Sequence, residues 1–408
     1  MNRRHFIGMA AAVAAGGAAA WKLWPDEGLF NPCLGALPPR LAGHELVRAA
    51  WEGLDPAQVW DSHAHLLGDG DSGSGAWLNP DSESPAHPIQ AAQRLFFLNA
   101  GCAVTGEVDA SYLARLSALM EAMPGGAKML LLAFDHAYTE RGEPALERSS
   151  FHIPNAYARA VAQRHPTRFE WAASVHPYRR DCISELETAA RQGARAVKWL
   201  PAAMDIDPSS ALCDGFYAAL ARLDLPLITH AGEERAAPGR AEQAYGNPLL
   251  LRRALDHGVR VVVAHCASMG EDRDLDRGPQ GPMTDSFALW ARLMDTPRYE
   301  GRLYGDISAM TQVNRAGPAL ARVIERADWQ ARLLNGSDYP LPGVMPLYSV
   351  GQLVELGFVE RAAAPVLIEL RRHNPLLFDF VVKRHLRSAG RRFGTSVFET
   401  RKFFSRGG

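Results

Sequence analysis

Two histidines separated by one residue, His63 and His65, stand at the end of an apolar segment and directly before a polar loop. Alternate residues of a β-strand point to the same side, so both imidazoles would face one space. Neighbouring imidazoles are ligands that a divalent metal takes readily. Most such pairs are surface or packing histidines, but this one ends an apolar strand. It predicts a metal site, and Asp61 is expected on the same face, where it could orient a ligand.

Three further polar residues end later apolar segments. His230 follows Leu-Ile-Thr, His265 follows Val-Val-Val-Ala, and Asp338 ends the stretch Leu-Leu-Asn-Gly-Ser-Asp. Any one of them alone is more often a satisfied buried residue than a ligand. Their succession in the order His-x-His, His, His, Asp is hard to reach by chance, so we interpret the five residues as one site.

Eight short apolar segments predict the strands that would position these residues. Amphipathic helical stretches lie between most of them, such as 183–192, 215–223 and 248–257. Repeated strand–helix units with continuously apolar strands indicate a parallel sheet, and eight units favour a closed (β/α)8 TIM barrel. The predicted strands are 59–66, 129–134, 169–175, 196–200, 227–230, 259–265, 303–308 and 333–338.

The predicted organisation places the barrel at 55–380, after a leader at 25–54 and before a basic tail at 381–408. The segment 68–88 and the long loops after the fifth and sixth strands are expected at the catalytic face. From Lys383 onward the tail has eight basic residues and one acidic residue, Glu399. We expect a solvated helix and tail outside the barrel, with a membrane-surface or partner patch as the alternative.

Composition is that of an ordinary globular protein. The chain has 408 residues, 47% apolar and 22% charged, with a net charge of −1, which favours neither nucleic acid nor an anionic membrane as a partner. Its five cysteines form no CxxC pair and are odd in number. We therefore expect neither a disulfide framework nor a thiolate zinc site. Nucleotide chemistry is disfavoured because no GxxxxGK[ST] or GxGxxG element is present.

The N-terminal segment 1–24 resembles a twin-arginine export signal. Arg3 and Arg4 precede Phe6, and the 16 residues from Phe6 to Trp21 are uncharged, fewer than the ~20 that span a membrane. We expect the twin-arginine export machinery to move the folded, metal-loaded protein to the periplasm. The alternative is an uncleaved membrane anchor with Trp21 and Trp24 at the interface.

The set of strand-end residues resembles the amidohydrolase superfamily, in particular the amidohydrolase-related group, which contains hydrolases and non-oxidative decarboxylases. The likeness covers roughly residues 55–380, and the stretches 246–250 and 374–378 are softer matches to the same group. The resemblance implies that His63, His65 and His230 bind a divalent metal, with zinc expected. It implies that His265 binds a second metal or polarises the substrate. Asp338 would bind metal and act as general base toward a water molecule.

Lys198 leaves the number of metals open. In binuclear members of the superfamily a lysine on the fourth strand is carbamylated and bridges two metals. A buried lysine needs a partner or a lowered pKa, so an ion pair with Asp61 or Asp338 is the alternative. We expect one metal, or two if Lys198 is carbamylated.

The expected reaction is hydrolysis of an amide, lactone or ester bond in a small molecule. One alternative is a decarboxylase, which would need a cationic partner for the carboxylate, and no arginine stands at a strand end. A second is a non-catalytic binding barrel, whose signature would be a lost ligand, and none is lost. A homo-oligomer remains open. The substrate contacts expected from strand ends are His136, His176, Trp199 and Tyr339, with Tyr138, Tyr178, Glu233 and Met310 nearby.

Overall fold

The computed structural model describes residues 27–235, 237 and 243–405. The predicted export signal therefore lies outside the described residues. All eight predicted strands are present within one or a few residues of their expected bounds. They are β1 (Trp60–His65), β3 (Lys128–Leu132), β5 (Phe169–Ala172), β6 (Val197–Trp199), β7 (Leu227–His230), β8 (Val261–Ala264), β11 (Leu303–Asp306) and β12 (Leu333–Leu334).

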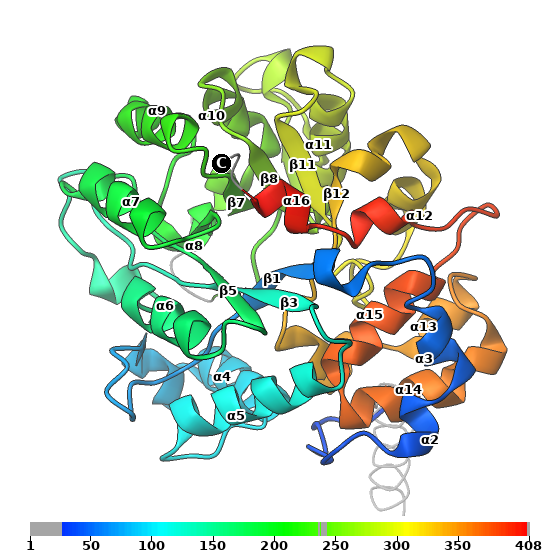
Figure 1. Cartoon of the computed structure of the whole chain (residues 1–408). Coiled ribbons are helices and arrows are strands. Elements are labelled where there is room, and N and C mark those ends of the chain that lie inside the picture. Colours follow the sequence, from blue (N-terminus) through cyan, green and yellow to red (C-terminus); the bar gives the residue numbers. More distant parts are fainter. Residues whose placement is uncertain (1–26, 236, 238–242, 406–408) are drawn as a thin grey trace, which may run out of the picture.

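The eight strands close into a parallel barrel. One sheet has the order β1-β3-β5 and the other the order β12-β11-β8-β7-β6. Parallel bridges between Ala173 and Val197 and between Ala64 and Tyr339 join the two sheets at both edges. The TIM barrel predicted from the sequence is confirmed (Figure 1).

Helices surround the barrel, and those predicted at 183–192 and 215–223 are confirmed (Figure 1). The segment 248–257 is split into a 3-10 turn, Pro248–Leu251, and the short helix α10. The outer helices are α5 (Val108–Glu121), α6 (Asn155–Arg164), α7 (Cys182–Arg191), α9 (Asp214–Arg222), α10 (Arg252–Asp256), α11 (Ser286–Met294), α12 (Pro318–Glu325), α14 (Ala364–His373) and α15 (Pro375–His385). Shorter helices are α2 (Pro39–Ala42), α3 (Glu45–Ala49), α8 (Pro201–Met204) and α13 (Val350–Glu355).

The long loops at the carboxyl ends of the strands contain structure of their own. After β1 the chain forms β2 (Trp77–Leu78), the 3-10 turn Pro80–Glu83 and the helix α4 (Pro88–Ala100). β2 pairs antiparallel with β4 (Phe151–His152), which follows β3. After β8, the strands β9 (Glu271–Arg273) and β10 (Met283–Asp285) form a hairpin. Structure thus accumulates where the sequence predicted the catalytic face.

The C-terminal tail packs against the amino-terminal end of the barrel, so the expectation of a solvated tail is wrong for this segment. Phe404, in α16 (Arg401–Phe404), joins the apolar cluster inside the barrel with Trp60, Leu130 and Val262. Thr400 donates a hydrogen bond of 2.6 Å to the Trp60 carbonyl. Arg401 and Lys402 of the tail are exposed, whereas Lys383 is buried and paired with Asp379.

A bulge in β1 separates Asp61 from the two histidines. The pairing register shifts between Asp61 and Ala64, so Trp60 faces the barrel interior while Asp61 lines a small cavity outside it with Trp51. The expectation that Asp61 shares the face of His63 is therefore wrong, because a bulge changes the alternation of side chains. Asp61 still supports the site, since it accepts hydrogen bonds from the backbone amides of His63 and Ser337.

One disulfide is present, contrary to the expectation that the cysteines would not pair. Cys33 in the leader is bonded to Cys102, just beyond the end of α4. Cys182, Cys213 and Cys266 are buried free thiols, which accounts for the odd count that argued against pairing. Among the described residues, no helix is both long and apolar enough to cross a membrane.

Candidate active site

His63 is held from behind by Asp306, which ends β11. The Nδ1 atom of His63 lies 2.9 Å from Oδ2 of Asp306 and 3.3 Å from Oγ of Ser308. Both the imidazole and the carboxylate are buried. A hydrogen on Nδ1 that is donated to Asp306 leaves the lone pair of Nε2 directed into the site, which is the arrangement of a metal-ligating histidine.

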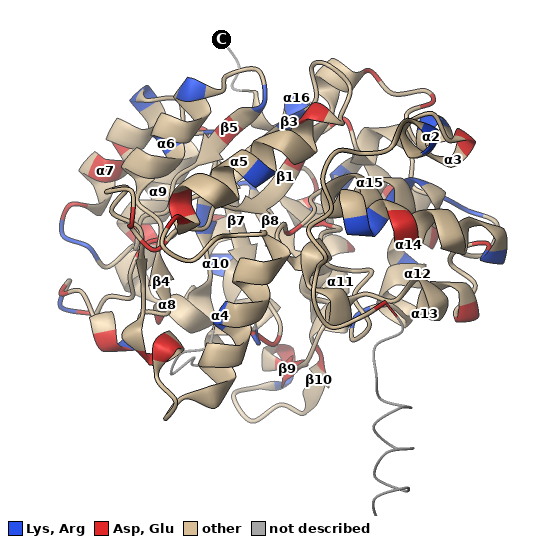
Figure 2. Cartoon of the chain, turned by 90° about the horizontal axis from the view of Figure 1, so that it is seen from below, with Lys and Arg blue, Asp and Glu red and all other residues tan. Residues whose placement is uncertain are grey.

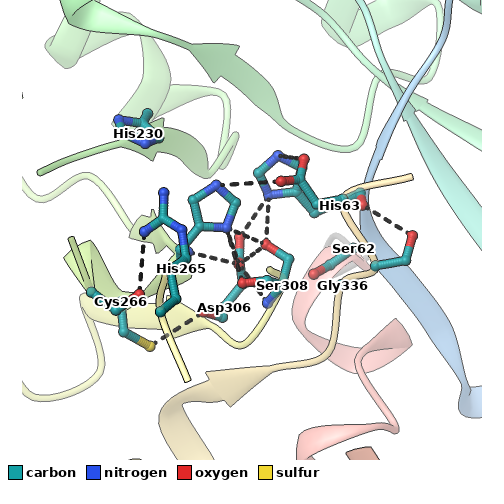
Figure 3. Close-up of polar contacts among 12 residues, drawn as sticks. Ser62, His63, His230, His265, Cys266, Asp306, Ser308 and Gly336 are labelled. Carbon is teal, nitrogen blue, oxygen red and sulfur yellow. Dashed lines mark hydrogen bonds and ion pairs between the residues drawn. The ribbon is translucent and has the colours of Figure 1, made fainter. Parts of the chain in front are cut away.

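His265 is fixed in the same manner from the adjacent strand. Its Nδ1 atom lies 3.0 Å from the Ser308 carbonyl and 2.8 Å from the Ser308 hydroxyl, and its Nε2 atom lies 3.6 Å from Oδ2 of Asp338. Figure 3 shows His63 and His265 converging above Asp306 and Ser308. His265 and Asp338 have φ angles of 55° and 59°. Such left-handed backbone is costly for residues other than glycine and is concentrated at functional sites.

Asp338 lies at the centre of the candidate metal site. Its Oδ1 atom is 3.1 Å from Nε2 of His65 and 3.5 Å from Nε2 of His63. Four ligands placed about 2.0–2.1 Å from a zinc ion at tetrahedral angles would be separated by about 3.3 Å. The residues present therefore fit a divalent metal next to Oδ1. His63, His265 and Asp338 form a group whose ligand atoms all lie within 4.8 Å of one another.

The charge states of these groups also suit a cation. Burial and the neighbouring Lys198 lower the pKa of His63, and burial holds the pKa of His265 well below its usual value. Burial alone would raise the pKa of Asp338, but His265, His63 and His65 hold it well below the ordinary range. The site therefore offers neutral imidazoles next to an ionised carboxylate, the protonation states that bind metal.

The loop that carries Asp338 packs closely against β1. A Cβ added at Gly336, two residues before Asp338, would lie 2.6 Å from Cβ of His63. Glycine at this position allows the loop after β12 to pass against β1 and deliver Asp338 to both histidines.

Lys198 ends inside the same cluster. Its Nζ atom is 3.0 Å from Nε2 of His63, so its hydrogen-bond partner is a histidine and not Asp61 or Asp338, the partners in the alternative interpretation of the sequence. Burial lowers the pKa of Lys198, against the opposing charges of Asp306 and Asp338. The side chain lines the same cavity as the predicted ligands.

His230 lies beside the cluster. Its Nε2 atom is 3.3 Å from Oε2 of Glu234, and its ring centroid is 5.5 Å from that of His265. Burial lowers its pKa to about 4, so the imidazole is neutral. In Figure 3 it stands apart from the polar contacts that link His63 and His265. The structure thus brings four of the five predicted strand-end residues into contact around Asp338 and places His230 at their margin.

Sequence reasoning missed Asp306, although the signal was present. It lies inside the seventh predicted strand, 303–308, and ends the shorter strand β11 that the structure shows, in Leu-Tyr-Gly-Asp. Its Oδ1 atom accepts hydrogen bonds from the amides of His265 and Ser308, each at 3.0 Å. Glu234, which faces His230, was also missed, four residues after a predicted ligand.

The site opens into a cavity of about 600 Å³, within the range of cavities that take drug-sized ligands. Its inner end is formed by the predicted ligands, Lys198 and Glu234. Its outer part is formed by the insertion after β1, by α4 and by the segment 146–151.

The four substrate contacts predicted from strand ends do not line this cavity. Both ring nitrogens of His176 are engaged elsewhere, since Nε2 donates to the Met204 carbonyl and Nδ1 accepts from the Tyr178 amide. Trp199 is buried outside the barrel against Phe216, Tyr339 is buried near Tyr112, and His136 stacks on His152. The prediction was wrong because a strand end fixes only the backbone position, whereas alternation decides whether a side chain points inward. Tyr138, Tyr178, Glu233 and Met310 are likewise outside the lining.

Two arginines do line the cavity, in contrast to the expectation based on strand ends. Arg94 comes from α4 and Arg148 from the loop after β3. Arg94 is paired with Glu83 at 2.8 Å, and Arg148 is paired with Asp205. Each guanidinium therefore already has a carboxylate partner.

The amidohydrolase family model matches residues 60–365. This chain belongs to the amidohydrolase family. The match spans the barrel from β1 through the first residues of α14 and includes every residue of the site described above. A search of curated proteins found no match.

Solved structures that are similar to this chain have low sequence identity to it. A protein described as a 2-pyrone-4,6-dicarboxylic acid hydrolase from Pseudomonas putida is 17% identical, with a TM-score of 0.42 over 79% of this chain and 97% of the other. A 5-carboxyvanillate decarboxylase from Sphingomonas paucimobilis is 13% identical, with a TM-score of 0.44 over 77% and 95%. An uncharacterised TIM-barrel protein from Bordetella bronchiseptica is 17% identical, with a TM-score of 0.45 over 69% and 86%.

Proposed function

We propose that the protein is a metal-dependent hydrolase that cleaves an amide, lactone or ester bond in a small molecule. The observation that carries this proposal is the position of Asp338. Its ionised carboxylate has histidine nitrogens on both oxygens, with His63 and His65 at Oδ1 and His265 at Oδ2. It stands at the inner end of a large cavity.

We assign different roles to the two sides of the Asp338 carboxylate, metal binding on the Oδ1 side and contact with the substrate on the Oδ2 side. We propose that His63, His65 and Asp338 would hold one divalent ion, with zinc expected from the preference of these ligands. His230 completes the set, as the family resemblance implies, because it is a neutral buried imidazole at the cavity wall. His265 faces Oδ2 and is left to contact the substrate. An ion at this position supplies Lewis acidity, which lowers the pKa of a water molecule and polarises a carbonyl.

In the proposed hydrolysis, Asp338 and His265 have different roles. Asp338 accepts a proton from the water that attacks the carbonyl carbon. The proton then passes from Asp338 to Nε2 of His265, whose lone pair faces Oδ2 because Nδ1 donates to the Ser308 carbonyl. The N–H so formed donates a hydrogen bond to the carbonyl oxygen, on which negative charge develops. The bond from the carbonyl carbon to the oxygen or nitrogen leaving group breaks, and the leaving group takes the proton from His265. Water is consumed, and a carboxylic acid and an alcohol or amine are released.

Hydrolysis is favoured over decarboxylation by the pairing of the cavity arginines. A substrate carboxylate needs a cation, and both Arg94 and Arg148 are neutralised by acidic partners. We also propose that Lys198 remains an amine and that one metal is bound, because its Nζ atom is accommodated against His63.

The test is a metal count on the purified protein followed by two assays. One ion per chain, with turnover of compounds from an ester, lactone and amide panel, supports the proposal. Release of carbon dioxide from aromatic acids without turnover of that panel would replace it with the decarboxylase. Two ions per chain and a carbamate on Lys198 would overturn the mononuclear site and leave the hydrolase assignment.

A further inference from the structure

The outer part of the cavity is apolar. We call it the outer chamber, and its wall is built by the insertion after β1, by α4 and by the loop between β3 and α6. Most of these side chains are only half-buried in the protein, since one face of each lies against the cavity. The apolar part of the wall consists of Leu66, Leu67, Trp77, Leu78, Phe97, Leu98, Leu146 and Phe151, and polar residues of the same segments line the rest.

Helix α4 turns one regular face toward this chamber. The residues that line the cavity, Gln90, Gln93, Arg94, Phe97 and Leu98, recur at the spacing of one helical face. Of the 13 residues of α4, Ala100 is fully buried, and Phe96 and Phe97 are half-buried against the core. Figure 2, in which charged residues are coloured, shows α4 almost entirely uncharged. Phe97 and Leu98 therefore give the cavity-facing side of α4 an apolar part, beside the polar Gln90, Gln93 and Arg94.

The charges at the rim are balanced among themselves. Arg94 pairs with Glu83, Arg148 with Asp205, and His87 lies 3.6 Å from Asp81. Among the cavity-lining residues that the structure describes, each arginine already has a carboxylate partner. An anionic group on a substrate would have to break one of these pairs, whereas a neutral apolar body would leave them intact.

We propose that the substrate is a neutral acyl compound, an ester, lactone or amide, with a large apolar body that fills the outer chamber. The scissile bond lies at Asp338, and the apolar body extends along the wall formed by Trp77, Phe97 and Phe151. This proposal rests on the proposed hydrolase function and adds the class of substrate. It excludes small polyanionic substrates, for which the apolar wall would offer no contact.

The test compares a short and a long substrate in two variants of one helix. The probes are p-nitrophenyl acetate and p-nitrophenyl decanoate, assayed with the metal-loaded protein. Burial of the extra methylenes is expected to raise kcat/KM for the decanoate at least about tenfold over the acetate. Phe97→Asp places a charge on the chamber wall and should remove most of that preference. Leu95→Asp makes a comparable change on the outer face, where Leu95 is 54% exposed, and should leave the preference intact.

A second variant and a binding measurement make the outcomes distinguishable. Leu146 lines the chamber and is 48% exposed, so Leu146→Asp tests the wall with little risk to folding. Nile red, a neutral apolar dye, should bind the wild-type protein and Leu95→Asp, bind weakly to both chamber variants, and be displaced by a long-chain lactone.

Each outcome bears on one proposal. Dye binding that depends on the chamber, with no turnover of any ester, lactone or amide, would overturn the hydrolase and the acyl part of the substrate class, and would support only the apolar character of the ligand. Equal turnover of acetate and decanoate would overturn the substrate class and keep the hydrolase. Identical behaviour of Phe97→Asp and Leu95→Asp would also overturn the substrate class.

Discussion

At the scale of single residues, the site depends on imidazoles whose Nδ1 atoms already make hydrogen bonds within the protein. His63 is held by Asp306 and His265 by Ser308, and both contacts are buried. Because each Nδ1 position is fixed, each Nε2 lone pair is directed toward Asp338 without further ordering of the ring. The fold therefore fixes the orientation of both imidazoles in the absence of a metal.

Replacement of single histidines should separate ligands from the residue that polarises the substrate. His63→Ala and His65→Ala should lose metal and activity together, and we expect the same of His230→Ala. His265→Ala should keep its metal and lose about 10²–10³-fold in kcat, the usual effect of removing one donor to a developing oxyanion. Metal content by mass spectrometry, beside steady-state kinetics, measures both. If His265→Ala loses its metal while His230→Ala retains it, the two roles are exchanged.

Asp306 should act on metal affinity through His63. Asp306→Asn keeps the shape of the side chain but removes the charge that fixes the imidazole, so the metal Kd should rise about 10–100-fold. Titration with a competing chelator measures the Kd. Asp272→Asn is a matched control, since Asp272 is also a buried carboxylate, bonded to Ser286 and remote from the site. An unchanged Kd for Asp306→Asn would show that the contact with His63 is only structural.

The strand ends led to residues that the structure gathers into one cluster, whereas the substrate contacts predicted from strand ends do not line the cavity. The clustered residues are positioned by the closed barrel, whose strand ends converge independently of the loops. The walls of the cavity come instead from β2, α4 and the segment 146–151, whose position depends on long-range packing that periodicity does not encode. Asp306 was missed because the predicted strand 303–308 extends two residues beyond it, whereas β11 ends at Asp306.

At the scale of elements, the barrel is closed at its two ends by different segments. The insertion after β1 and α4 cover the catalytic end, while the tail residues up to Phe404 cover the other. Because of the bulge in β1, Trp60 points into the barrel interior toward its amino-terminal end, and His63 points into it toward the catalytic end. A sequence of alternating residues does not reveal where one extra residue is inserted, so Asp61 was placed on the wrong face.

Removal of the Phe404 side chain should destabilise the barrel. Phe404 is 1% exposed within the inner cluster, and Phe→Ala at buried positions costs about 3–5 kcal/mol. Phe404→Ala should therefore lower the midpoint of chemical unfolding clearly, with metal affinity preserved at low temperature because the ligands lie at the opposite end. Lys402→Ala, at an exposed neighbouring position, is the control. If both variants unfold at the wild-type midpoint, the tail does not stabilise the barrel.

At the scale of the whole molecule, the disulfide and the N-terminal sequence agree about compartment. Disulfides persist in oxidising compartments and are rare in the cytosol, and Cys33 pairs with Cys102 across 69 residues. This pairing supports the proposal that the protein functions in the periplasm. The odd number of cysteines concealed it, because one pair among five leaves three that are buried and unpaired.

The disulfide predicts a thiol count that depends on where the protein matures. Protein recovered from the periplasm and unfolded without reductant should expose three thiols, and five after reduction, since three cysteines are free. Titration with a thiol reagent measures both values. Cys33→Ser with Cys102→Ser should show three thiols under either condition and should lose about 4 kcal/mol of stability by loop-closure entropy. Five thiols in the unreduced periplasmic protein would contradict the pairing.

The twin arginines predict the route by which the folded protein leaves the cytoplasm. Arg3→Lys with Arg4→Lys keeps the positive charge of the segment but removes the arginine pair, so the protein should remain in the cytoplasm if that pair is what the export machinery reads. The control is Arg40→Lys, a comparable change at an exposed residue of the leader. Fractionation with immunodetection locates each variant, and the thiol count reports independently on its redox environment. A double variant that reaches the periplasm at the wild-type level, with three thiols, would show that the N-terminal segment is not a twin-arginine signal.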